Sequence, residues 1–173
     1  MAPVLVLVGA PGSGKTTVGG LVAGFRGLGF RDTDADVEAA AGCSTSDIFV
    51  DEGEAGFRRR EQAAALSALR EHDGVLALGG GAIESTDVRE ALSGLPVVLL
   101  TVSAPEAAKR VGIDGARPMS LGNVRSVWTN QLKTRQPLYE SVAVATVDTD
   151  ELSPDQVAGL VATVMDTTSR ETS

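Results

Sequence analysis

The chain has 173 residues, of which 43% are hydrophobic, and it carries a net charge of −8 and a single cysteine, Cys43. This length predicts one domain over residues 1–173, while the charge argues against a nucleic-acid binder and still permits an anionic ligand in a cleft with a few basic side chains. No apolar run approaches the roughly 18 residues of a membrane span, and a lone cysteine cannot form an internal disulfide, which fits the reducing cytoplasm. No obvious coiled coil or repeat calls for assembly, so we expect a monomer.

The first predicted strand leads into a glycine-rich loop. Val4–Val8 is a short apolar run typical of a strand buried on both faces, and residues 14–25 can form a helix. Between them, "GAPGSGKTT" satisfies the phosphate-loop pattern in the strand–loop–helix context that supports it. Backbone N–H groups and the helix N-terminus would hold phosphate oxygens, Lys15 would reach the β- and γ-phosphates, and the Thr16 hydroxyl could bind Mg²⁺. The loop therefore predicts a nucleoside triphosphate site.

The second predicted strand, "GFRDTD", ends in the carboxylates Asp32 and Asp34. Ligands of open α/β sheets gather at the carboxyl ends of the strands. There, one carboxylate could hold Mg²⁺ through water and another could take a proton from an attacking hydroxyl. Beside a phosphate loop, this chemistry is favoured over the alternative of a polar strand end with Asp36 starting a helix. Arg31, within the strand, is expected only at an edge of the sheet.

The middle of the chain predicts a long helix and a second glycine cluster. Residues 54–71 are rich in Ala, Leu, Arg and Glu, which favour a helix. Val75–Leu78 predicts a third strand, and three glycines follow it. Because glycines carry no side chain, the backbone there can approach a compact ring, and an N–H of Gly80 or Gly81 can donate to it. A tight strand-to-helix turn is the plainer alternative, and one backbone can serve both.

Two further strands complete the predicted sheet, over Val97–Val102 and Val142–Val147. Short buried strands that alternate with helices indicate an α/β protein with a parallel sheet covered on both faces. Residues 112–122, "GIDGARPMSLG", form either a surface loop or, beside a nucleotide site, a mobile lid. The polar residues 166–173 predict a C-terminal tail that frays.

Six short motifs then follow one another in an order that can be compared with known families. They are "GAPGSGKTT", "DTD", "GEAGFRRRE" at 53–61, "LGGGA" at 78–82, "ARP" at 116–118 and "RQPLY" at 135–139. In this order and spacing, from residue 4 to about residue 154, the chain resembles the shikimate kinase family. The resemblance implies a three-layer P-loop kinase fold, similar to that of nucleoside-monophosphate kinases, with a five-stranded parallel sheet, helices on both faces and a lid. It also implies transfer of the γ-phosphoryl group of ATP to the 3-hydroxyl of shikimate, giving shikimate 3-phosphate and ADP in the pathway to chorismate and aromatic amino acids.

The resemblance further implies how the acceptor is held. Asp34 grips the shikimate hydroxyls and is the candidate base, while Arg58 and Arg135 bind the carboxylate. The shikimate-binding helical segment spans approximately residues 35–61. Two arginines from separate segments suit a carboxylate because each guanidinium is a forked donor. Arg58 could instead pair with Glu61 along the same helix face. The remaining acceptor contacts fall on Gly79, Gly80 and Gly81.

For the phosphoryl group, the resemblance implies a magnesium ion held by Thr16 and Asp32, with ATP as co-substrate. Lys15 and the lid residue Arg117 reach the group being transferred and are catalytic together with Asp34. This chemistry needs positioning and neutralised oxygen charge rather than a covalent step, which is what two cationic side chains and a metal supply.

For the nucleotide base, the resemblance implies that Arg110 stacks over adenine. Ser153 or Pro154 would lie on the other face of the ring, although the loop "DTDELSP" is acidic where relatives often carry Asn and Arg. The implied nucleotide-binding residues are Gly12, Ser13, Gly14, Lys15, Thr16, Thr17, Arg110, Arg117 and Ser153.

Two other functions stay open from the residues alone. One is a different small-molecule kinase on the same scaffold, acting on gluconate or a nucleoside monophosphate. The other is a nucleotide-binding regulatory module without chemistry. The glycine cluster with Arg58 and Arg135 favours a carboxylate-bearing polyol over a nucleobase, and the complete set of phosphoryl-transfer residues argues against a module without chemistry.

Overall fold

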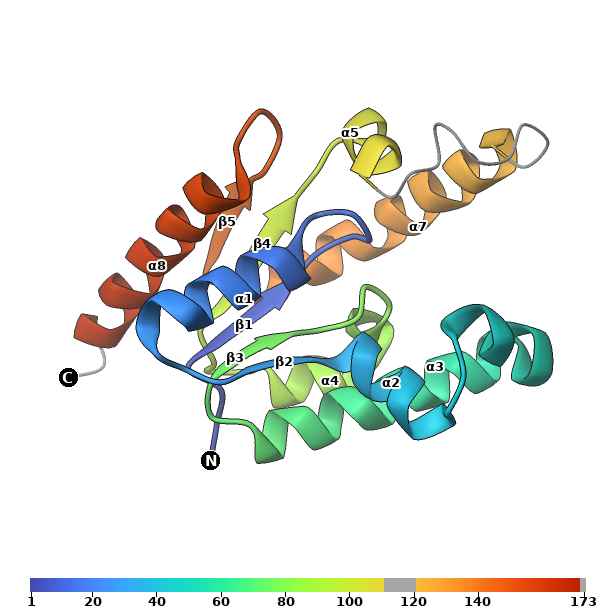
Figure 1. Ribbon diagram of the computed structural model, residues 1–173, viewed down its shortest axis with the longest axis horizontal. Coiled ribbons are helices and arrows are strands. Elements are labelled where there is room, and N and C mark those ends of the chain that lie inside the picture. The colour runs from blue at the N-terminus through green and yellow to red at the C-terminus, as the bar shows by residue number, and fades with distance from the viewer. Residues whose placement is uncertain (111–120, 172–173) are drawn as a thin grey trace.

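The computed structural model describes residues 1–110 and 121–171, and for residues 121–125 and 169–171 it describes the backbone only. Five strands, a short 3₁₀ helix and seven α-helices occupy this part of the chain (Figure 1). In order they are β1 (Leu5–Val8), α1 (Lys15–Arg26), β2 (Phe30–Asp32), α2 (Thr33–Ala41), α3 (Thr45–Glu71), β3 (Val75–Ala77), η1 (Ala82–Glu84), α4 (Thr86–Ala91), β4 (Val97–Thr101), α5 (Ala104–Arg110), α7 (Leu121–Val142), β5 (Ala145–Asp148) and α8 (Pro154–Glu171).

The strands form one parallel sheet in the order β2-β3-β1-β4-β5. Because β1 lies in the middle, its carboxyl end and the loop that follows it lie at the centre of one sheet edge. The fold is therefore the predicted α/β class with a five-stranded parallel sheet. Arg31 lies on the edge strand β2, as predicted, and pairs there with Asp36 at 2.6 Å and with Glu71 at 3.2 Å.

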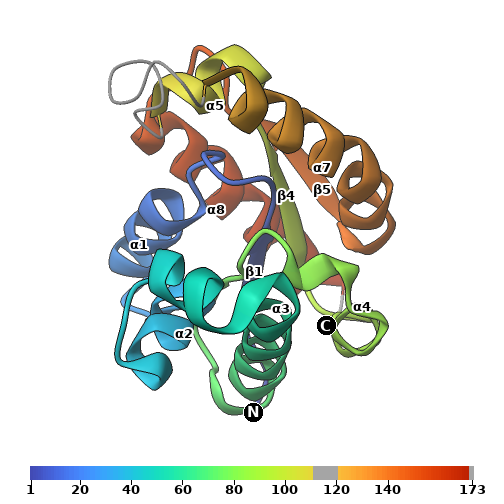
Figure 2. The ribbon, with the colours of Figure 1, turned by 90° about the vertical axis from the view of Figure 1, so that its right-hand side faces the viewer.

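Helices cover both faces of the sheet, which makes three layers (Figures 1 and 2). One core contains Val6 and Val8 of β1 and packs against α3, α4 and α7; Leu5 and Leu7 point the other way, to a core shared with α1 and α8. This alternation follows from the two-residue period of a strand. With both faces covered, β1 is apolar throughout, which explains its continuous run of apolar residues.

Several observed boundaries differ from the predicted ones. The second strand ends at Asp32 rather than Asp34, because the Asp32 side chain accepts the N–H of Asp34 and caps α2. The fifth strand begins at Ala145, since α7 continues to Val142. At the C-terminus, α8 continues to Glu171 through residues predicted to fray. None of the described helices is long and apolar enough to cross a membrane.

Candidate functional site

The phosphate loop joins β1 to α1 at the central sheet edge. Gly14 caps α1 with a φ of 90°, a left-handed conformation that costs a glycine little. The Lys15 ammonium lies inside the loop, where it donates to the carbonyl oxygens of Gly9 at 2.8 Å and Ala10 at 3.2 Å. Burial lowers the pKa of Lys15, while the neighbouring Asp34 carboxylate, among others, raises it. A cationic side chain is thus held inside a curved run of backbone, as an anion-binding loop requires.

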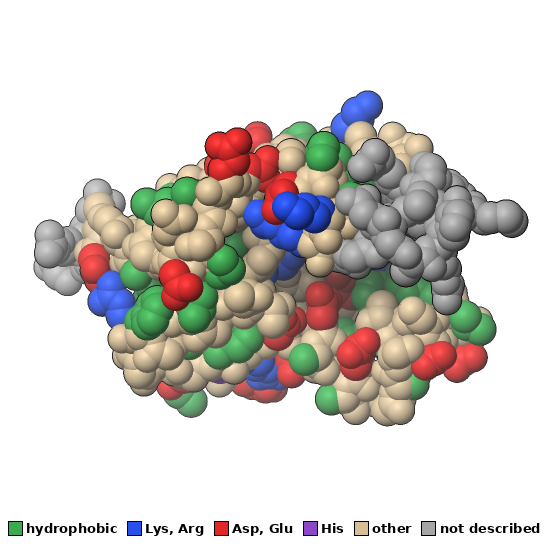
Figure 3. Space-filling view, turned by 45° about the horizontal axis from the view of Figure 1, so that its top comes forward, with side chains coloured by type: hydrophobic (Ala, Val, Ile, Leu, Met, Phe, Trp, Pro, Cys, Tyr) green, Lys and Arg blue, Asp and Glu red, His purple; other side chains and the backbone are tan. Residues whose placement is uncertain are grey.

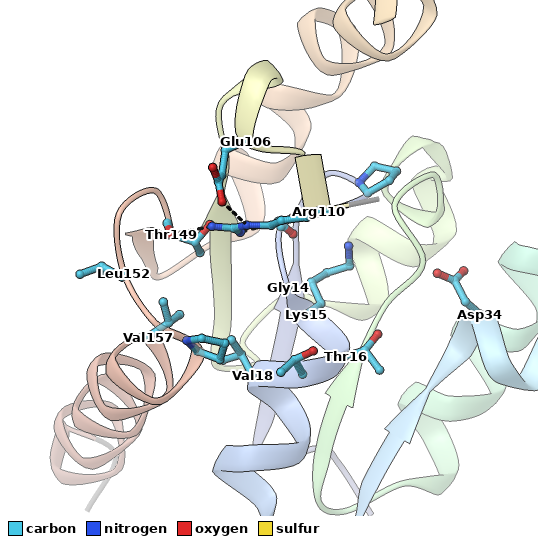
Figure 4. A pocket seen from close by; sticks show the side chains of 15 residues that line it. Gly14, Lys15, Thr16, Val18, Asp34, Glu106, Arg110, Thr149, Leu152 and Val157 are labelled. Carbon is cyan, nitrogen blue, oxygen red and sulfur yellow. Dashed lines mark hydrogen bonds and ion pairs between the residues drawn. The ribbon is translucent and has the colours of Figure 1, made fainter. Parts of the chain in front are cut away.

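A cavity of about 600 Å³ adjoins this loop, and we call it the nucleotide cavity. Figure 4 shows Arg110 at one end of it and Asp34 at the other, with Lys15 between them. Arg110 is held at its edges, because it donates to the hydroxyl and carbonyl oxygens of Thr149, both at 2.8 Å, and to Glu106 at 3.1 Å. The flat face of the guanidinium is therefore in a fixed orientation from which it can stack on a base. The lining residues are Pro11, Gly12, Ser13, Gly14, Lys15, Thr16, Thr17, Val18, Asp34, Glu106, Arg110, Thr149, Leu152, Pro154 and Val157.

A second cavity, of about 770 Å³, contains most of the predicted acceptor-binding residues, and we call it the acceptor cavity. Its polar lining residues include Asp34, Arg58 and Arg135, and its apolar wall includes Phe49 and Phe57. Gly80 and Gly81 also line it, whereas Gly79 does not. In the space-filling view, basic side chains gather near the centre of the face and acidic side chains lie below them, in the hollow between two lobes (Figure 3).

The two cavities meet at three residues that line both of them: Pro11, Thr16 and Asp34. At this junction the Thr16 hydroxyl donates to Asp32 Oδ2 at 2.5 Å, so the two predicted magnesium ligands lie side by side. The described residues contain no group of three or more His, Cys, Asp or Glu side chains that could hold a metal by themselves. Two oxygen ligands on the protein fit a magnesium ion that takes its other ligands from phosphates and water.

Asp34 combines access to solvent with close protein surroundings. Its side chain is exposed through the open cavity, yet neighbouring groups enclose the carboxylate on the protein side. Burial raises its pKa to about 6; Lys15 opposes this shift, and the nearby Asp32 and Glu61 add to it. A carboxylate with this pKa is ionised at neutral pH and is a better proton acceptor than an ordinary aspartate.

The glycine cluster makes room for side chains, a role the sequence did not reveal. A Cβ on Gly79 would collide with Asp34, and one on Gly81 would collide with Arg58. The prediction for Gly81 as a donor to the acceptor is wrong, because its N–H donates to the buried Glu61 carboxylate at 2.9 Å. The N–H of Gly79 is likewise taken, by the Thr33 hydroxyl at 2.9 Å. Within this cluster, Gly80 carries the N–H for which the prediction stays open.

Each predicted carboxylate-binding arginine already holds a carboxylate of the protein. Arg58 donates to Glu61 at 2.6 Å, which is the pairing left open from the sequence, and it still lines the acceptor cavity. Arg135, only 3% exposed, donates through Nε to Glu84 at 2.7 Å. In both cases a fixed ion pair orients a forked guanidinium whose remaining N–H groups can face a ligand.

Some predicted residues have other positions or partners. Arg117 and most of the predicted lid, residues 112–120 of 112–122, lie outside the described residues. Ser153 caps α8 by accepting the N–H of Gln156 at 3.2 Å, and it is Leu152 and Pro154, on either side of it, that line the nucleotide cavity. Trp128 donates to the Pro11 carbonyl at 3.1 Å, and Tyr139 is buried.

Sequence reasoning missed three residues that hold the site together. Glu61 was treated only as a possible partner of Arg58, although its position in "GEAGFRRRE" was a usable signal. Glu84 and Thr149 had no such signal, because their partners Arg135 and Arg110 lie 51 and 39 positions away in the chain.

Comparison with known proteins gives a consistent result. Residues 11–166 match the family model described as shikimate kinase. A protein named shikimate kinase from Salinispora tropica is 52% identical to this chain, over 95% of this chain and 99% of its own length. A protein of the same name from Streptomyces coelicolor is 51% identical, over 90% of this chain and 91% of its own length. The solved structure of shikimate kinase from Acinetobacter baumannii in complex with shikimate is 34% identical, with a TM-score of 0.86 over 96% of this chain and 94% of that chain.

Proposed function

The chain belongs to the shikimate kinase family, and on that basis we propose that it transfers the γ-phosphoryl group of ATP to the 3-hydroxyl of shikimate. One observation supports this proposal beyond family membership: the nucleotide cavity and the acceptor cavity meet at Asp34 and Thr16. A phosphoryl donor and an acid-bearing acceptor bound in these cavities would approach each other at one carboxylate. Transfer in such a site depends on positioning and on neutralising oxygen charge.

On the donor side, the phosphate loop is proposed to bind the triphosphate through its backbone and through Lys15. The ammonium of Lys15 would exchange the carbonyl oxygens of Gly9 and Ala10 for phosphate oxygens, which are the stronger, charged acceptors. Arg110 and Pro154 would enclose the base, since both line the nucleotide cavity.

On the acceptor side, Asp34 is proposed to orient the acceptor hydroxyl and take its proton. Its raised pKa suits a general base that works near neutral pH. Arg58 and Arg135 would bind the shikimate carboxylate from two sides of the acceptor cavity, and the Gly80 N–H would donate to a ring hydroxyl.

Magnesium is proposed to bind at the junction of the cavities, through Thr16 directly and through Asp32 with water between. The adjoining oxygens of these two side chains support this assignment. When bound, the ion would neutralise charge on the phosphate oxygens. Arg117, in the proposed lid of residues 112–122, would supply further positive charge, an assignment that rests on the family motif alone.

The proposal is tested by offering the purified protein ATP and Mg²⁺ with shikimate, quinate, gluconate or AMP and following ADP release. We expect release that depends on shikimate and is much slower with the other three compounds. Release without dependence on shikimate, or faster release with gluconate or AMP, would overturn the assignment. We also propose that the enzyme acts as a cytoplasmic monomer, which sedimentation of the purified protein and cell fractionation would check.

A further inference from the structure

Helix α3 is interrupted at Gly53. This residue has φ 71° and ψ −178°, a combination that only glycine adopts readily. The interruption leaves a short helix over residues 45–52 and a long one over residues 54–71, and the first turns of α3 depart from the axis of its longer part (Figure 1). An interrupted helix needs something to fix the angle between its two parts.

An ion pair spans this interruption. The Arg60 guanidinium grips the Glu52 carboxylate with two nitrogens: Nη2 donates to Oε1 at 2.6 Å, and Nε lies 3.1 and 3.0 Å from Oε1 and Oε2. Forked geometry of this kind is the most directional arrangement available to an arginine. Gly56 leaves space for it, because a Cβ at that position would collide with the Glu52 side chain.

The short helix carries part of the acceptor cavity. Phe49 and Thr45 line the cavity, and the Phe49 ring stacks on Phe57 of the long helix with centroids 4.6 Å apart. At its other end the short helix is tied to α2, because Glu38 Oε1 accepts from both the N–H and the hydroxyl of Thr45 at 2.9 Å. Residues 45–52 are therefore a cavity wall that is fastened at one end by Glu38 and at the other by the Glu52–Arg60 pair.

We propose that Glu52 and Arg60 are positioning residues for acceptor binding: their ion pair across Gly53 holds residues 45–52 against the acceptor cavity. The identity of the acceptor rests on the function proposed above, whereas the mechanical role of the pair does not. Neither side chain needs to touch the acceptor. Holding the wall in place before binding lowers the cost of ordering it when the ligand arrives.

The proposal gives separate roles to three consecutive arginines. Arg58 lines the acceptor cavity and pairs with Glu61, Arg60 pairs with Glu52 across the interruption, and Arg59 between them is exposed. Because Arg59 has the same charge and adjoins Arg60 in the same helix, Arg59→Gln is a matched control for Arg60→Gln.

The test compares Glu52→Gln, Arg60→Gln, the double variant and Arg59→Gln. Because 36% of each side chain in the pair is exposed to solvent, which screens the interaction, we expect each of the first two variants to raise the shikimate KM by about two- to five-fold, with the ATP KM and kcat unchanged. The double variant should be no worse than either single variant, since both remove the same interaction. Amide hydrogen exchange of residues 45–52 in the free protein should accelerate by a similar factor of about two to five.

Several results would overturn the proposal. One is an equal rise in the shikimate KM for Arg60→Gln and Arg59→Gln. Another is a double variant whose rise in KM is the product of the rises in the two single variants. A third is an unchanged rate of amide hydrogen exchange in residues 45–52. The exchange measurement needs no substrate, so it tests the ion pair even if the wild-type protein fails to phosphorylate shikimate. A failure of the proposed function and a failure of this inference are therefore distinguishable.

Discussion

The nucleotide cavity and the acceptor cavity are built in different ways. Pro11 to Val18, one continuous run of residues, supplies about half of the nucleotide cavity, largely through backbone. The acceptor cavity is lined by side chains from β2, α2, α3 and α7 and by backbone of the glycine cluster. The first depends on the conformation of a loop, and the second depends on how well separate elements are placed relative to one another.

The cavities also differ in how their charges are held. Lys15 is held by backbone carbonyls, whereas Arg58 and Arg135 are each held by a glutamate. Backbone N–H groups and an ammonium can serve any phosphate ligand, whereas under the proposed function the oriented guanidinium groups would select an acceptor whose carboxylate meets both of them. The difference indicates that general phosphate binding resides in the loop and specificity in the ion pairs of the acceptor side.

The largest expected effect comes from Asp34, where the two cavities meet. Asp34→Asn keeps the shape of the side chain but replaces one acceptor oxygen by an NH2 donor and removes the base. We expect kcat to fall by about 10²- to 10⁴-fold, the usual contribution of a general base. ATP binding, measured by calorimetry, should persist because the phosphate loop is intact.

The pH profile of the wild-type enzyme offers an independent check. Because burial raises the pKa of Asp34 to about 6, protonation should remove the base below that pH, and kcat/KM should decline there. Loss of ATP binding in Asp34→Asn, or a profile with no decline near pH 6, would contradict the role of Asp34 as the base.

The contrast between a cavity built on one loop and a cavity built from separate elements also explains which features are predictable from sequence. The phosphate loop, the order of five strands and the edge position of Arg31 depend on patterns within short stretches, and the structure has them where predicted. The boundary of the second strand was missed because Asp32 has two functions, as the end of a strand and as the cap of α2.

The acceptor side was predictable only in part, because its key contacts join distant positions. Resemblance to a family pointed to Arg58 and Arg135, but no local pattern shows that Glu84 holds Arg135 or that Glu61 occupies the N–H of Gly81. These contacts exist only after α3, α7 and the glycine cluster have packed together. A backbone donor in particular is invisible in sequence, since every residue but proline has one.

The next largest effects are expected on the KM values, and they should differ between an arginine of the acceptor cavity and an arginine of the nucleotide cavity. Arg135→Ala removes charged hydrogen bonds worth about 2 kcal/mol to the acceptor, so the shikimate KM should rise about 30-fold with little change in the ATP KM. Arg110→Ala should instead raise the ATP KM, by about five-fold, with little change in the shikimate KM, because stacking of a cation on a base contributes about 1 kcal/mol. Initial rates with each substrate varied in turn measure both.

Controls for this pair of variants address folding and charge. Arg135→Lys keeps the charge but loses the forked geometry, so its shikimate KM should lie between those of the wild type and Arg135→Ala. Thermal melts would detect unfolding caused by the unpaired Glu84. If Arg135→Ala raised both KM values equally, the assignment of separate cavities to donor and acceptor would be wrong.

The smallest expected effect concerns stability and again involves Asp34. Its pKa is raised on folding to about 6 from an ordinary value of 3.8, so the stability contributed by the protonated form is fully present below pH 3.8 and is lost as the pH rises through 6. Asp34→Asn should therefore stabilise the fold above pH 6, by about 1 kcal/mol once the shift is discounted for screening of an exposed carboxylate. For a chain of this size that corresponds to a rise of about 2–4 °C in Tm.

The stabilisation by Asp34→Asn should vanish at pH 4. Asp51 is exposed, so Asp51→Asn should raise Tm at neither pH. Thermal melts of both variants at pH 8 and pH 4 would measure these effects. If the enzyme becomes more stable when it loses its base, then the ionised Asp34 destabilises the fold and is kept because activity requires it. The phosphate loop, whose charge is matched to backbone oxygens, has no comparable carboxylate. A lower Tm for Asp34→Asn at pH 8 would instead mean that Lys15 and Asp34 stabilise each other across the junction of the two cavities.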